Sequence, residues 1–238
     1  MRLRFGLMLL VCGIAAGCAK APPREVNLLL PRMGSQTLFL HVGEGQVDVT
    51  PSSDGTVHVG VKLERPRGLF GYWTSAIEAK ALDGAALSHS LADGVRNVQL
   101  SFPAGTDGAG IQQIWQVQMP PIMYLKLAVD TGEVNVGGVA GGMDVNINVG
   151  NLGINVPYGA LHAKVGVGAI EARAHVLDYG AVLLATDIGT VELTVNEAAA
   201  GTVQRTGAGA RVDYQGKGTN VIDLSSGTGK VSLALSDH

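Results

Sequence analysis

Cysteine, aromatic side chains and charge are all scarce in this chain of 238 residues. It has two cysteines, 5% aromatic residues, 16% charged residues and a formal net charge of −3. Both cysteines, Cys12 and Cys18, lie near the start, so the rest of the chain cannot form an internal disulfide. With so few aromatic residues, the core has to be aliphatic. Because no stripe of basic residues occurs, we expect no nucleic-acid partner.

The sequence motifs of the common enzyme classes are also missing. We find no nucleophile elbow, phosphate-binding loop, Cys/His metal spacing or serine triad in order. The left-handed acyltransferase helix is excluded, because its hexapeptide period does not occur. The sequence therefore predicts no catalytic residue, no bound metal and no cofactor.

Histidines and basic residues in the second half of the chain offer little chemistry. His162 falls on an outward position and His175 on a return loop, and nothing in their spacing brings them together. We interpret both as surface residues. Polysaccharide lyases on β-helices combine acids with a basic catalytic residue. Lys164 and Arg173 are available for that role, but no acidic cluster faces them in the predicted register.

Acidic residues at the corners of the chain suggest calcium, but only weakly. Asp130, Asn148 and Asp187 share one position of a repeat, where stacked strands would bring their oxygens near one another. A calcium site needs six to eight oxygen ligands, and Gly166 interrupts this series. We therefore interpret these side chains as turn residues.

Glycine, in contrast, is abundant, with 34 residues, about twice its usual share of roughly 7%. From about residue 125 to 235 an alternating apolar run, a glycine corner and a second alternating run recur. The first apolar residue after each corner recurs at steps of 18, 18, 21, 21 and 19 residues. These anchor residues are Val134, Leu152, Ile170, Val191, Val212 and Val231. Such a period is typical of a solenoid of stacked units.

Apolar and polar residues alternate strictly within each unit. At the six positions of the unit predicted to face inward, 30 of 36 residues are apolar, against 4 of 24 at the interleaved positions. A period of two indicates β-strands with one buried face. Each unit therefore holds two short strands joined at a corner, and equivalent strands of successive units pair in parallel.

The corner position is glycine in every copy except the fifth, where it is Ala210. Glycine suits a bend that needs close backbone approach. The fifth copy also places Arg205 on an inward position, where an unpaired charge would be costly. Either the register slips there, which we favour, or Arg205 meets an acid.

The start of the chain is a targeting segment. Arg2 and Arg4 precede the apolar run from Phe5 to Ala16, which is too short to span a bilayer comfortably. The run ends in Ile14-Ala15-Ala16-Gly17-Cys18, which resembles the bacterial lipoprotein signal, in which the cysteine becomes the lipid-bearing first residue. An ordinary secretory signal that happens to contain Cys18 is the alternative.

These boundaries divide the chain as follows: residues 1–17 are the signal peptide, 18–36 a proline-containing tether, 37–120 an N-terminal β portion and 121–238 the regular solenoid. Around residue 47 the corner-and-strand pattern appears once more, as a detached seventh copy, and we expect the strands near residues 38–49 and 56–63 to form a hairpin-like unit. Residues 65–95 are an irregular insertion, for which helix and strand both remain open. Within it, Phe70, Tyr72 and Trp73 form either a contact loop or a plug for the end of the solenoid.

The run from Leu38 to Val49, the Asp/Ser turn after it and the units of Asp-Thr-Gly-Glu-Val type resemble the bacterial putative-adhesin β-solenoid family. This resemblance covers roughly residues 37–235 and implies an all-β, stacked fold. It implies no catalytic residue.

We therefore expect a non-enzymatic protein of the cell envelope that is anchored through Cys18. In a diderm the outer membrane is favoured, because Ala19 is not the Asp of inner-membrane retention. An unknown envelope protein or polysaccharide is the expected partner for binding, adhesion or scaffolding. The alternative is a carbohydrate-active or metal-dependent β-solenoid enzyme.

Overall fold

The computed structural model describes residues 23–31, 36–64, 76–106, 108, 110–156, 159–174, 181–196, 202–204, 210–215 and 221–236. Within these ranges the chain forms thirteen strands and one short helix, so the prediction of an all-β protein is confirmed. The strands join one mixed, open sheet, and eleven of them follow in the order β1-β3-β6-β2-β7-β8-β9-β10-β13-β12-β11.

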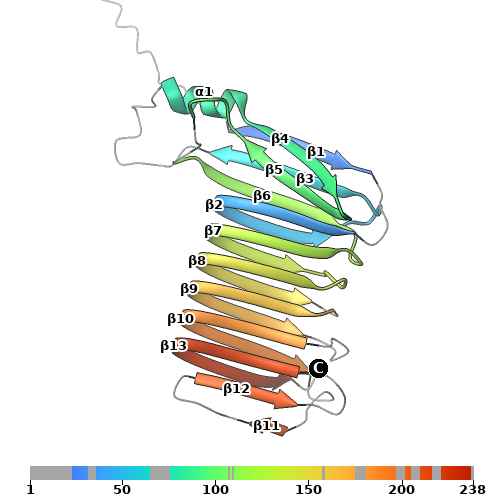
Figure 1. Ribbon diagram of the computed structural model, residues 1–238, viewed down its shortest axis with the longest axis vertical. Coiled ribbons are helices and arrows are strands. Elements are labelled where there is room, and N and C mark those ends of the chain that lie inside the picture. Colours follow the sequence, from blue (N-terminus) through green and yellow to red (C-terminus); the bar gives the residue numbers. More distant parts are fainter. Residues whose placement is uncertain are drawn as a thin grey trace, which may run out of the picture.

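Six of the strands are long, with 14 to 16 residues each. They are β2 (Thr37–Pro51), β7 (Tyr124–Gly137), β8 (Met143–Val156), β9 (Leu161–Ala174), β10 (Ala181–Asn196) and β13 (Val221–Ser236). Figure 1 shows that each of them bends back on itself, so that its two halves lie in two layers. We call the part before the corner glycine the first half and the part after it the second half.

The long strands pair with their neighbours in parallel and in strict register. Anchor residue Val134 of β7 lies beside Leu152 of β8, which lies beside Ile170 of β9, and the same row continues to Val191 of β10. The parallel register that the sequence predicts between these copies is therefore observed. The detached copy near residue 47 joins the same row, because Val47 of β2 pairs with Val134.

The core lies between the two layers and is aliphatic. Inward residues of the first halves and of the second halves are buried, whereas the residues between them point to solvent. For β7 to β10 these buried residues are Leu125, Met143, Leu161 and Val182 in the first halves and Val136, Ile154, Ala172 and Leu193 in the second halves. Burial of every second side chain is the pattern that the alternation predicts.

The fifth copy of the repeat is not a stacked unit, and here the sequence prediction is wrong. Strand β10 pairs directly with β13, with Val191 beside Val231. Strands β11 (Thr202–Gln204) and β12 (Ala210–Gln215) form an antiparallel pair, and β12 is antiparallel to the first half of β13. Ala210 is therefore no corner residue. Alternation has the same period in a hairpin and in a stacked unit, so it could not separate the two.

The pairing of β2 with β3 (Val57–Glu64) is also predicted wrongly. These strands follow one another in the chain, but β6 (Gln112–Met119) lies between them, parallel to β2 and antiparallel to β3. The first half of β2 pairs instead with β5 (Val95–Ser101), which carries the antiparallel β4 (Ala86–Ala92) at its other edge. The turn after β2 thus connects strands that are second neighbours.

Two further segments at this end differ from expectation. Residues Arg24–Leu30, predicted as part of the tether, form β1, which is antiparallel to β3. In the insertion 65–95, helix α1 (Ala76–Gly84) precedes β4, so helix and strand both occur there. The guanidinium of Arg24 donates to the carbonyl oxygens of Asp83 and Ala85, which ties the start of β1 to the end of α1.

Candidate functional site

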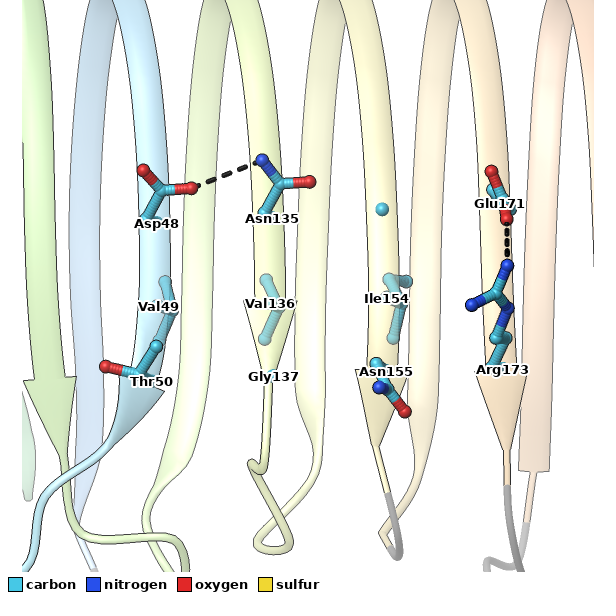
Figure 2. A pocket seen from close by; sticks show the side chains of 11 residues that line it. Asp48, Val49, Thr50, Asn135, Val136, Gly137, Ile154, Asn155, Glu171 and Arg173 are labelled. Atoms are coloured by element: carbon cyan, nitrogen blue, oxygen red, sulfur yellow. Dashed lines mark hydrogen bonds and ion pairs between the residues drawn. The ribbon is translucent and has the colours of Figure 1, made fainter.

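An open groove crosses the outer face of the second halves of β2, β7, β8 and β9. We call it the outer groove, and Figure 2 shows it from close by. Its polar lining comes from two parallel rows of outward residues, which also include two glycines, Gly137 and Gly153. The residues that matter here are Asp48, Asn135, Gly153, Asn155, Glu171 and Arg173.

Strand register explains why these residues meet. Asp48 lies beside Asn135, Asn135 beside Gly153, and Gly153 beside Glu171, so one row crosses four strands. Residues two positions further along point to the same side and make the second row, in which Asn155 lies beside Arg173. The groove therefore brings together residues as far apart in sequence as Asp48 and Arg173.

Gly153 deepens the middle of the groove. A Cβ atom at this position would lie 2.7 Å from Oδ1 of Asn135, so a larger residue would displace that side chain. In Figure 2 the side chains of Asp48 and Asn135 lie on one side of the gap, and those of Glu171 and Arg173 on the other. At the gap no side chain covers the backbone of β8.

Hydrogen bonds within one strand and between neighbouring strands hold the polar groups of the groove. Asn135 donates from Nδ2 to Oδ1 of Asp48 at 3.2 Å, and Gln46 donates from Nε2 to Oδ2 of Asp48 at 3.0 Å. Arg173 donates from Nη2 to Oε1 of Glu171 at 2.9 Å. Two carboxylates and one guanidinium give the groove a formal charge of −1. Such a mixture of donors and acceptors matches the hydroxyl groups of a neutral polymer better than an acidic one.

Of the three residues predicted to share one position, Asp130 and Asn148 are in contact on the outer face of the first halves, and Asp187 lies further along the same face. Asn148 donates from Nδ2 to Oδ1 of Asp130 at 3.2 Å, whereas Asp187 forms an ion pair with Lys164 at 3.2 Å. Over the part of the chain that the structure describes, no three His, Cys, Asp or Glu side chains are placed to hold a metal ion. His162 is partly exposed on the same face.

A contact between Asp54, Thr56 and His58 follows strand β2. The amide and the hydroxyl of Thr56 donate to Oδ1 of Asp54 at 2.9 and 2.7 Å, and Nε2 of His58 lies 2.8 Å from Oδ2. The backbone hydrogen bond from Thr56, followed by the side-chain bonds, lowers the pKa of Asp54 well below its usual range. The cluster is exposed, and its hydrogen bonds fix the turn between β2 and β3.

Sequence reasoning missed an exposed row of β-branched side chains beside the corners. Val149, Val167 and Ile188 lie beside one another, each 46% exposed or more.

Sequence reasoning missed the outer groove for a different reason. Its residues appear in the sequence only as outward positions of separate units, and the glycines at positions 137 and 153 are the signal of a gap.

The sequence-predicted site residues Cys18, Phe70, Tyr72 and Trp73 lie outside the described residues, as do His175 and Arg205. Lipidation at Cys18 and the contact loop therefore stay predictions. Among the described residues, no helix is long and apolar enough to cross a bilayer.

Comparison with known proteins gives no family model and no curated protein that matches. Solved structures do match, and three of them, each covering 90% of this chain, are as follows. A putative cell adhesion protein from Clostridium sporogenes is 14% identical, with 100% of its chain covered and a TM-score of 0.46. A putative adhesin from Bacteroides fragilis is 10% identical, with 97% covered and a TM-score of 0.32. A putative lipid binding protein from Parabacteroides distasonis is 8% identical, with 97% covered and a TM-score of 0.22.

At these identities and TM-scores, no ligand or activity follows from the likeness. Two of the three structures are named as a putative cell adhesion protein and a putative adhesin. This chain is similar to bacterial putative adhesins, as its sequence predicts.

Proposed function

We propose that this protein is a non-enzymatic, lipid-anchored β-solenoid of the cell envelope that binds a neutral polysaccharide in the outer groove. The observation that carries the proposal is the pair of polar rows across β2, β7, β8 and β9, the first of which has a gap at Gly153. Extended polymers suit such a surface, because neighbouring strands repeat its donors and acceptors at about 4.8 Å.

The charge of the groove favours a neutral chain. Asp48 and Glu171 contribute two carboxylates against the single guanidinium of Arg173. An acidic polysaccharide would meet net repulsion, whereas hydroxyl groups can both donate to and accept from this lining. We therefore expect neutral glycans to bind and uronic-acid polymers to bind weakly or not at all.

Two matched variants on one strand test the groove. Arg173 and Lys164 both lie on β9, and each forms one exposed ion pair, with Glu171 and Asp187 respectively. We expect Arg173→Ala to weaken binding of a neutral polysaccharide by about tenfold, the scale of one lost hydrogen bond to a charged group. Lys164→Ala, on the other face, should leave affinity unchanged. Calorimetry on the full chain after a glycan screen measures both.

Equal affinity for Arg173→Ala and the parent would show that the groove is not the binding site. Shortening of the polysaccharide during incubation with the parent would instead favour the competing carbohydrate-active enzyme. Loss of binding on chelation would favour a metal-dependent protein. Asp130 and Asn148 would then be the first candidate metal ligands.

The lipid anchor rests on the sequence from Ala15 to Cys18. We expect Cys18→Ser to abolish incorporation of a labelled fatty acid, because the acceptor thiol is gone. Cys12→Ser should leave the labelling intact, since that residue would leave with the signal peptide. Labelling that survives Cys18→Ser would refute the anchor without affecting the groove.

A further inference from the structure

The second half of β13 is an open strand edge. Strand β12 pairs only with residues Val221–Ser226 of β13, and no strand among the described residues lies beyond the remainder. Val231 and Leu233 are consequently only partly buried, although their neighbours in the same rows, Val191 and Leu193, are 0% and 1% exposed. An edge of this kind offers unpaired backbone groups to another strand.

The opposite end of the same layer is the edge strand β1. Val26 and Leu28 point inward there and are only partly buried, and Leu29 is 64% exposed on the outer face. Strand β1 is antiparallel to β3, β3 is antiparallel to β6, and β6 is parallel to β2. Strand β1 therefore runs in the same direction as β13.

Residues of the two edge strands, β1 and β13, also belong to the same rows across the sheet. Val26 belongs to the row that runs through Val61, Trp115, Val47 and the anchor residues to Val231, and Leu28 belongs to the row of Leu233. By the same pairs, Glu25 shares a row with Lys230. Both side chains are exposed, and within the described residues neither forms an ion pair.

We propose that the open edge of β13 binds β1 of a second copy of this chain, so that copies stack head to tail with their sheets continuous. Placed in phase, Glu25 of one copy faces Lys230 of the next, and the partly buried residues Val231 and Leu233 gain the neighbours they lack. Exposed Leu29 would lie in the row of Ala234.

The layer of the second halves accommodates this pairing, because it ends in an open edge at both β13 and β1. At the β13 end the layer of the first halves extends by two more strands, β12 and β11, whereas the layer of the second halves stops at β13. At the other end the second-half layer extends further, with β6, β3 and β1 beyond β2 against β5 and β4 (Figure 1). Between successive copies the layer of the second halves would hold three strands, whereas the layer of the first halves would hold four. Pairing of two β13 edges with each other would instead leave β1 and Leu29 uncovered.

A cysteine trap tests the contact directly. Facing residues on neighbouring parallel strands have Cα atoms about 4.8 Å apart, within the range of about 4.4–6.8 Å that a disulfide needs. We expect the full chain with Glu25→Cys and Lys230→Cys to give a ladder of covalent dimers, trimers and larger species on mild oxidation. The matched control combines Glu25→Cys with Lys126→Cys and should give no ladder, because the exposed Lys126 lies on β7, which is paired on both sides inside the sheet.

Charge reversal provides the second test. Glu25→Lys and Lys230→Glu should each weaken self-association of the full chain by roughly tenfold, since an opposite-charge pair becomes a like-charge pair on facing strands. Sedimentation of the detergent-solubilised protein measures this. The double variant, and also an equimolar mixture of the two single variants, should recover the parent's association.

Three outcomes would overturn the proposal. The first is a parent chain that stays monomeric at all concentrations, and the second is a double-cysteine variant without multimers. The third is efficient dimer formation by Lys230→Cys alone, which would show that two β13 edges pair with each other. None of these results depends on whether the outer groove binds a polysaccharide.

Discussion

Gly168→Ala is expected to destabilise the protein by about 3–5 kcal/mol, a large part of a typical total of about 5–15 kcal/mol. Gly168 has a φ of +145°, and a Cβ added to it would lie 1.7 Å from the carbonyl oxygen of Gly150 on the neighbouring strand. Because that oxygen belongs to the backbone of a paired strand, the clash cannot be relieved by rotating a side chain. The strands would have to separate at the corner.

The same obstruction occurs along the whole corner. In each long strand a Cβ on the corner glycine would lie within 1.9 Å of a backbone oxygen of the adjacent strand. These residues are Gly45, Gly132, Gly150, Gly168, Gly189 and Gly229. One alanine therefore disturbs a contact that recurs between each pair of adjacent long strands.

Gly94 is the matched control for this prediction. It also has a positive φ, of 74°, but an added Cβ would meet nothing within 4 Å. Gly94→Ala should therefore cost only about 1 kcal/mol, the strain of a left-handed backbone without a clash. Denaturant melts of both variants measure the difference. If the two variants have equal stability, close approach of the strands is not the reason for glycine at the corner.

Leu193→Asp is expected to cost several kcal/mol, roughly 4 or more, because it places a carboxylate in the aliphatic core and removes packing. Leu193 is 1% exposed and lies beside Ala172 of β9 and Leu233 of β13. Its side chain therefore has no polar neighbour in its own row. Thermal unfolding followed by circular dichroism measures the loss.

The adjacent residue provides the control, because Glu192 points to the opposite face. It is exposed and lies beside Glu171, so Glu192→Lys replaces a like-charged neighbour by an opposite one. We expect a stability within about 0.5 kcal/mol of the parent. Tolerance of Leu193→Asp together with unfolding by Glu192→Lys would mean that the inward and outward faces are assigned the wrong way round.

Head-to-tail stacking would have a consequence for binding. Each copy carries one outer groove on the layer that β1 and β13 would make continuous, so a stack presents the groove repeatedly along one side. A polymer that spans two grooves binds the second at a raised effective concentration, which increases avidity without a new contact. Charge-reversal variants should therefore lose avidity for a long polysaccharide while keeping their affinity for a short oligosaccharide.

The sequence by itself determined which face of each strand is buried and where the strands bend. Alternation is a local property, since a strand with one buried face must carry apolar residues at every second position, as in Val134 and Val136. The corner glycines are visible in the same way, because the backbone of a neighbouring unit leaves no room for a side chain. Lipidation at Cys18 stays a prediction from the sequence alone, because that segment lies outside the described residues.

Only the tertiary structure decided which strands are neighbours. Apolar alternation is the same whether a strand stacks in parallel, as β13 does, or returns antiparallel, as β12 does, so the place of residues 210–215 could not be predicted. The insertion of β6 between β2 and β3 depends on residues 48 or more positions away. The outer groove and the matching edges at Glu25 and Lys230 exist because distant residues share a row, and a row is defined by backbone hydrogen bonds between strands, which the local sequence does not specify.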